Sequence, residues 1–137
     1  MEHQRPPTPV GNLEARFSAD VFLYYPRLRV LASYVRAHLG EHLSLKRGAK
    51  VVGLEKKYFS TFFRSKVGIT WTEWVRILRV TRAAEQIQLR EESMASIAFA
   101  AGFRDIRTFE RAFKRYVGMP PKAYQASVRP KSRVPPL

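Results

Sequence analysis

The chain has 137 residues, and its 25 Lys and Arg against 11 Asp and Glu give a formal charge of +14. This excess of positive charge favours a polyanionic partner, with nucleic acid ahead of an anionic membrane surface. The absence of cysteine excludes disulfides, thiolate metal ligands and a cysteine nucleophile, and no run of about 18 apolar residues is present to span a bilayer. We expect one domain, or two small subdomains sharing a helix, in the cytoplasm at the nucleoid and without a membrane partner.

Both ends of the sequence are rich in proline and basic residues, as in residues 5–9 and 129–136. This composition predicts an N-terminal tail or arm over residues 1–25 and a basic, Pro-rich C-terminal tail over residues 128–137. Residues 13–25 allow three structures: an extra helix, an arm or part of a linker.

Between the tails, apolar residues recur at helical spacing and glycines end the segments, which predicts an all-α fold of about seven helices. Suitable N-cap residues precede several helices: Ser93 and Asp105 begin two of them, and Thr70 with Glu73 forms a capping box. A Pro-Pro pair at residues 120–121 begins the last helix, where proline fits the first turn. The predicted helices span residues 26–39, 44–52, 55–67, 70–89, 93–102, 105–118 and 120–127.

A short pattern occurs twice in the chain. A small residue and, four positions later, a glycine are followed by an amphipathic basic helix, an arrangement typical of a helix-turn-helix. The helix residues recur after 50 positions and the turn residues after 49, so the second turn is one residue longer. We expect helix-turn-helix subdomains over residues 26–69 and 90–127, joined by a linker helix over residues 70–89. The first copy contains Ala49, Gly53, Phe59, Phe63, Arg64 and Gly68, and the second contains Ala98, Gly102, Phe109, Phe113, Lys114 and Gly118.

The second helix of each copy has an apolar face and a basic face. With successive residues about 100° apart, the phenylalanines fall on the inner face, where core packing explains them better than stacking on bases. Arginine and lysine on the outer face suit guanine edges in the major groove, which admits an α-helix. A solvent-exposed surface would explain one basic face alone. Two such faces, each preceded by a helix and a glycine turn, favour binding to DNA. Glu110 fits either a cytosine amine or an ion pair with Lys114. The candidate DNA-binding residues are Lys56, Lys57, Ser60, Thr61, Arg64, Arg104, Arg107, Glu110, Arg111, Lys114 and Arg115.

The linker helix has a length that suits this mode of binding. About 20 residues at 1.5 Å each give roughly 30 Å, close to the about 34–36 Å of one DNA turn. One chain could therefore place two recognition helices in adjacent major grooves of double-stranded DNA that bends towards the protein. Because the two copies differ in sequence, we expect an asymmetric site that is bound by a monomer.

Residues 26–127 resemble the DNA-binding domain of the AraC/XylS family of bacterial transcription regulators. The second copy carries the stronger match, from Ile97 through the turn at Gly102 to Tyr124. The resemblance implies a sequence-specific activator that acts as a monomer, bends promoter DNA and contacts RNA polymerase, with no catalysis, cofactor or metal. About 25 residues precede the first predicted helix, which suits the short single-domain members; a DNA-binding fragment of a longer, effector-controlled regulator is the alternative.

The sequence departs from the family pattern at three positions, two in the first copy and one in the linker helix. Gly48 replaces a large apolar residue, Glu55 replaces a serine cap, and Gln86 replaces a leucine. Glycine inside a helix costs about 1 kcal/mol relative to alanine. We expect these changes to weaken the packing and the capping of the first copy.

Two other functions and one metal site fit the residues less well. A non-specific, architectural nucleic-acid protein needs only charge and no paired helix-turn-helix pattern. A repair enzyme that accepts a methyl group needs a cysteine, which the sequence lacks. A zinc pair formed by His38 and His42 is interrupted by Gly40.

Overall fold

The structure is a computed structural model that describes residues 13, 16–89 and 91–129. Of the predicted tails over residues 1–25 and 128–137, residues 1–12, 14–15 and 130–137 lie outside the described residues. The described part of the chain contains eight α-helices and no strand, so the all-α prediction is confirmed. Seven helices begin and end within two residues of the predicted ranges, and α1 is the addition. The helices are α1 (Val21–Tyr24), α2 (Pro26–Ala37), α3 (Leu45–Val52), α4 (Lys56–Val67), α5 (Trp71–Leu89), α6 (Met94–Ala100), α7 (Ile106–Val117) and α8 (Pro121–Val128).

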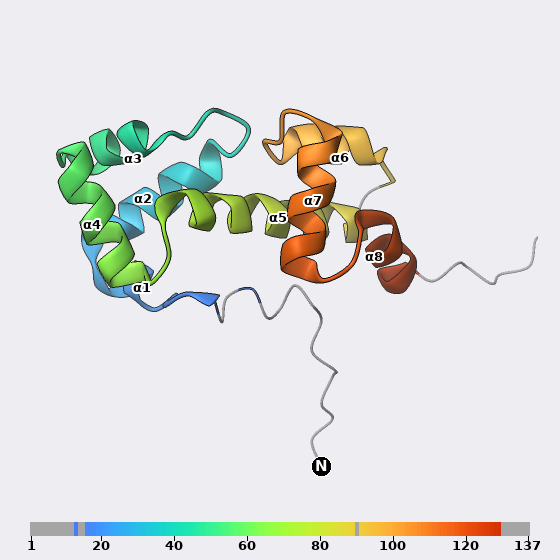
Figure 1. Ribbon diagram of the computed structural model, residues 1–137, viewed down its shortest axis with the longest axis horizontal. Coiled ribbons are helices and arrows are strands. Elements are labelled where there is room, and N and C mark those ends of the chain that lie inside the picture. The colour runs from blue at the N-terminus through green and yellow to red at the C-terminus, as the bar shows by residue number, and fades with distance from the viewer. Residues whose placement is uncertain (1–12, 14–15, 90, 130–137) are drawn as a thin grey trace, which may run out of the picture.

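Figure 1 shows α5 as a long helix through the middle of the molecule. Helices α1 to α4 gather around its N-terminal half, and α6 to α8 gather around its C-terminal half. Each half contains one helix-turn-helix, formed by α3 with α4 and by α6 with α7. The helix α5 is therefore the predicted linker helix, and both helix-turn-helix subdomains pack against it.

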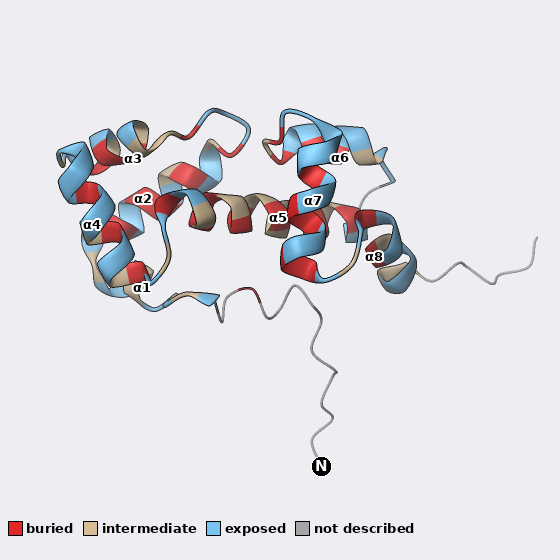
Figure 2. Cartoon of the chain, viewed as in Figure 1, coloured by how far each residue is buried: buried red, intermediate tan, exposed pale blue. Residues whose placement is uncertain are grey.

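Each half has its own hydrophobic core, and α5 contributes side chains to both. In the first core, the Phe63 ring packs against Trp74 with the ring centroids 5.3 Å apart. In the second core, the Phe113 ring packs against Phe109 and Tyr124 at 5.6 and 5.5 Å. Buried residues accordingly recur along the whole of α5 (Figure 2). On α5, Trp71, Trp74, Val75 and Leu78 belong to the first core, whereas Ile77, Val80, Ala83, Ala84 and Ile87 belong to the second.

Gly48 in α3 allows the first core to close. A Cβ at this position would lie 2.8 Å from Cη2 of Trp71 and 3.1 Å from Cε2 of Phe59, closer than side chains pack. The Trp71 indole thus occupies the space of a larger residue 48, and its Nε1 donates to the Leu43 carbonyl at 3.0 Å. The expectation that Gly48 weakens the packing of the first copy is wrong, because the Trp71 indole fills the space beside the glycine.

The described residues of the segment 13–25 form both an arm and a short helix. Leu13 is 1% exposed and lies in the second core, whereas Phe17 packs against both cores. In α1, the Phe22 ring stacks on Trp74 with the centroids 4.9 Å apart. This segment therefore contacts both halves of the molecule.

Predicted N-caps form at the start of α5, α6 and α7. The side chains of Thr70, Ser93 and Asp105 each accept from the backbone amide three residues later, at 3.2, 3.1 and 2.8 Å. The predicted capping box forms only in part, because the Glu73 carboxylate accepts from the hydroxyl of Tyr116 at 3.3 Å. That hydrogen bond joins the start of α5 to α7 instead of completing the cap.

Candidate nucleic-acid interface

Both helix-turn-helix turns contain a glycine in the left-handed region. Gly53 has a φ of 70° and Gly102 a φ of 104°, values that only glycine adopts readily. The helix after the first turn is capped two residues beyond its glycine, by Glu55, and the helix after the second turn three residues beyond, by Asp105. The second turn is therefore one residue longer, as predicted, and the two caps are 50 positions apart like the helices that follow them.

Glu55 is a fully formed cap of α4. Its carboxylate oxygens accept from the backbone amides of Tyr58 and Lys57 at 3.0 and 3.1 Å. These hydrogen bonds hold the pKa of Glu55 below its ordinary value of 4.5. The expectation that Glu55 leaves this helix start poorly satisfied is wrong, because a carboxylate also suits the positive end of the helix dipole.

The candidate DNA-binding residues all lie on the exposed surface. On α4 and α7 they lie opposite Phe59, Phe63, Phe109 and Phe113, which are fully buried and pack in the cores. Exposure makes the candidates available to a partner, while their contacts with DNA stay predictions. They are Lys56, Lys57, Ser60, Thr61 and Arg64 on α4, Arg104 in the turn before α7, and Arg107, Glu110, Arg111, Lys114 and Arg115 on α7.

The second helix of each helix-turn-helix, α4 and α7, is strongly basic. The helix α4 carries four cationic residues and no acidic one, and α7 carries four cationic residues with Glu110. In the described part of the chain no ion pair joins Glu110 to Lys114, so the intrahelical pair that the sequence allowed is not formed. The guanidinium of Arg115 lies 5.3 Å from the ring centroid of Tyr116, which orders this cation at the edge of the basic face.

Arg79 on α5 fixes how the two halves meet, a role that the sequence did not reveal. Its Nε donates to the Leu39 carbonyl at 3.2 Å and its Nη2 donates to the Glu41 carbonyl at 2.7 Å, which ties α5 to the loop after α2. Gly102 packs against the same groups, because a Cβ there would overlap the Leu39 carbonyl oxygen and lie 2.6 Å from Nε of Arg79. One signal in the sequence is a cation within the otherwise apolar run 77–80.

Neither a metal centre nor a membrane-spanning helix is found among the residues that the structure describes. His38, one of the two histidines considered as zinc ligands, stacks on the ring of Tyr34 with the ring centroids 4.0 Å apart. Its Nδ1 lies 2.8 Å from the Tyr34 carbonyl oxygen. The imidazole is thus packed at the end of α2.

The caps at Glu55 and Asp105 predict a loss of stability in acid. Hydrogen bonds from the amide and the hydroxyl of Thr108 hold the pKa of Asp105 below its ordinary value of 3.8, as the capping amides do for Glu55. A lowered folded-state pKa contributes stability that is present above the unfolded-state value and is lost as the pH falls through the folded-state value. We expect the melting temperature to fall between about pH 5 and pH 2, and to fall less in a double variant with Glu55→Gln and Asp105→Asn. Circular dichroism melts across this range measure the effect, and parallel curves would contradict it.

Comparison with known proteins gives the class of this fold. A family model described as "Helix-turn-helix domain" matches residues 49–127, more than half of the chain. The regulatory protein PocR of Salmonella typhimurium is 32% identical over 111 residues, which cover 81% of this chain and 37% of PocR. An AraC-type regulator from Chromobacterium violaceum superposes with a TM-score of 0.71 at 23% identity, covering 78% of this chain and 96% of that one. The DNA-binding domain of AdpA, solved in complex with a target DNA, gives 0.70 at 24% identity, covering 78% and 98%.

The fold and its relatives define a helix-turn-helix DNA-binding domain of a transcription regulator. The chain belongs to the AraC/XylS family, a non-enzymatic family of DNA-binding regulators, and the resemblance seen in the sequence is confirmed. The chain spans 37% of the length of PocR, and 39% and 40% of the length of two other curated relatives, YobQ of Bacillus subtilis and LumQ of Photobacterium leiognathi.

Proposed function

We propose that this chain is a sequence-specific activator that binds an asymmetric promoter site as a monomer, with α4 and α7 in adjacent major grooves. The supporting observation is the pair of exposed basic faces, one on each helix-turn-helix, on either side of the 19-residue helix α5. Nineteen residues span roughly 28 Å, somewhat less than the about 34–36 Å of one DNA turn. A bend of the duplex towards the protein brings both grooves within reach. From the family resemblance, the further partner is RNA polymerase.

Selection of bound sequences from a random DNA pool tests this proposal. We expect an enriched, asymmetric motif, a footprint of about 20 base pairs with protection in two adjacent major grooves, and a complex whose mass corresponds to one chain per duplex. A footprint confined to one groove, or an obligate dimer on the DNA, would contradict the binding mode. A pool without enrichment would favour the non-specific, architectural alternative.

A second candidate is the DNA-binding part of a longer, effector-controlled regulator. The observation that favours it is the length of PocR, YobQ and LumQ, of which this chain spans 37% to 40%. Both candidates bind DNA through the same two helices. The mass of the native protein, detected in a cell extract with an antibody against this chain, separates them.

Arg111→Ala is expected to reduce discrimination between DNA sequences, whereas Lys57→Ala is expected to weaken binding to all sequences alike. Both side chains are exposed on the outer faces of their helices. An arginine that bonds a guanine edge in bidentate fashion supplies about 1–3 kcal/mol of discrimination, and a phosphate-bound lysine contributes about 1 to the salt slope. Fluorescence anisotropy titrations with the selected duplex and a scrambled one measure both variants.

The opposite pattern would assign base recognition to α4. In that case Arg111→Ala weakens both duplexes equally and Lys57→Ala removes the preference. Arg107→Ala provides a second variant on the outer face of α7, and we expect it to behave like Arg111→Ala.

A further inference from the structure

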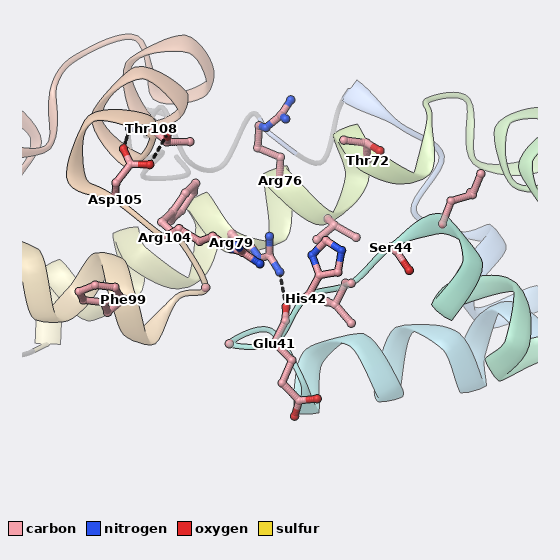
Figure 3. Close-up of a pocket in the computed structure, with 16 residues that line it drawn as sticks. Glu41, His42, Ser44, Thr72, Arg76, Arg79, Phe99, Arg104, Asp105 and Thr108 are labelled. Atoms are coloured by element: carbon pink, nitrogen blue, oxygen red, sulfur yellow. Dashed lines mark hydrogen bonds between the residues drawn. The ribbon is translucent and has the colours of Figure 1, made fainter.

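A cleft of about 570 Å³ lies between the two halves of the molecule (Figure 3). Its walls come from the loop after α2, the start of α3, the N-terminal half of α5, the turn before α7 and the first turn of α7. Three arginines line it: Arg76 and Arg79 on α5, and Arg104 in the turn before α7. Of these, only Arg104 is among the predicted DNA-binding residues.

Neither of the two acidic residues that line the cleft forms an ion pair with these arginines. The Glu41 carboxylate accepts from the guanidinium of Arg47 at 2.6 Å, and Figure 3 shows it on the far side of its backbone from Arg76. The Asp105 carboxylate caps α7 and accepts from the amide and the hydroxyl three residues later, at 2.8 and 3.0 Å. Among the described residues, the side chains of Arg76 and Arg104 take part in no hydrogen bond or ion pair.

The guanidinium groups of the cleft lie close enough to repel one another. Burial lowers the pKa of Arg79, and the charges of Arg104 and Arg76 lower it further. Arg79 is held by the carbonyls of Leu39 and Glu41, so Arg76 and Arg104 are the two cations left to face a ligand. A concave surface that holds more cations than anions, and whose arginines have no ion-pair partner, attracts an anion.

The cleft lies between the two helix-turn-helix subdomains. Thr108 on the first turn of α7 lines one side, and Ser44, the N-cap of α3, lines the other. The first helix of a helix-turn-helix crosses the DNA backbone while the second enters the major groove. When α4 and α7 occupy adjacent major grooves on one face of a duplex, the minor groove between those grooves, with its two phosphate strands, lies between the two subdomains, as the cleft does.

We propose that this cleft binds the phosphate backbone at the central minor groove, with Arg76 and Arg104 as phosphate contacts and Arg79 as the positioning residue that shapes the cleft. The inference rests on the proposed function and deepens it. Neutralising phosphates on one face of a duplex leaves the repulsion on the other face unopposed, so the duplex curves towards the neutralised face. The arginines of the cleft thereby provide a cause for the bend that the length of α5 requires.

Arg76→Gln tests this proposal, with Arg82→Gln as the matched control. Arg82 lies on the same helix, but it lines a different pocket and its Nη2 donates to the Arg36 carbonyl at 3.1 Å. The probe is the duplex enriched from the random pool, made either with native phosphates or with neutral methylphosphonates beside the central minor groove. Circular dichroism melts check the fold of each variant, and the exposed Arg104→Gln is the second variant if Arg76→Gln melts early.

We expect Arg76→Gln to bind the native duplex about fivefold more weakly at 0.15 M salt, with a salt slope smaller by about 1. Replacing the native phosphates with methylphosphonates should weaken binding by the wild type and by Arg76→Gln. The loss should be about fivefold larger for the wild type, because the variant has already lost one phosphate contact. Energy transfer between dyes at the two ends of the duplex should report a smaller bend with Arg76→Gln. Arg82→Gln should match the wild type in all three measurements.

Equal losses for the wild type and Arg76→Gln on methylphosphonate DNA would overturn the inference while leaving the proposed function intact. Indistinguishable behaviour of Arg76→Gln and Arg82→Gln would overturn it as well, since general charge would then explain the effect. A wild-type chain that prefers no sequence in the pool would instead refute the proposed function, and the inference with it.

Discussion

Raising the salt concentration from 50 to 200 mM is expected to weaken DNA binding about 10³–10⁵-fold. The chain carries a charge of +14, and its candidate contacts lie on the exposed basic faces of α4 and α7. If about 6–10 phosphates are neutralised, log K falls with log salt at a slope of about −5 to −9, because counterions are released from the duplex. Anisotropy titrations at several salt concentrations measure the slope.

Charge-removing variants locate the origin of this slope. Arg64 and Lys114 occupy equivalent exposed positions, 50 residues apart, on the two recognition helices. A double variant with Arg64→Gln and Lys114→Gln should reduce the slope by about 2 in magnitude, whereas Arg82→Gln should leave it unchanged. A wild-type slope near zero would refute the electrostatic account.

Gly102→Ala is expected to lower the free energy of unfolding by about 2–5 kcal/mol in total. The residue has a φ of 104°, and a left-handed conformation costs alanine about 1–2 kcal/mol. The new Cβ would also overlap the Leu39 carbonyl oxygen and crowd Nε of Arg79, which adds about 1–3 kcal/mol of overpacking. Urea unfolding measures the loss.

Gly118→Ala is the matched control for this substitution. Gly118 has a similar φ of 93°, but a Cβ there would have no atom within 4 Å. The control should therefore show only the backbone cost of about 1–2 kcal/mol. Equal losses in the two variants would mean that the packing of Gly102 against the loop after α2 contributes nothing to stability.

The helices were predictable from the sequence because their ends depend on local features. Gly53, Gly68 and Gly118 adopt positive φ angles at the predicted helix ends, and the buried phenylalanines follow helical spacing. The arm was not predictable, because Leu13 and Phe17 are isolated apolar residues that become buried only through contact with distant helices. Local periodicity carries no information about such contacts.

The basic faces of the candidate interface can be predicted from helical periodicity in the same way. The tertiary contacts that hold the two basic helices in place cannot. Gly48 departs from the family pattern, yet Trp71 from another helix fills the space beside it. Arg79 bonds carbonyls that lie 40 and 38 residues earlier in the chain, so its role depends on the tertiary fold. Glu55 stands where the family pattern has a serine, and a carboxylate caps a helix by the same hydrogen bonds.

The sharing of α5 between two cores makes the domain one cooperative folding unit. Trp71 and Trp74 of this helix belong to the first core, and Ile77 and Val80 belong to the second. Unfolding either half would strip α5 of part of its packing and weaken the other half, so we infer a single two-state transition. By mass action, a DNA contact made through one recognition helix then stabilises both halves against unfolding. Occupancy of either groove thus protects the whole domain.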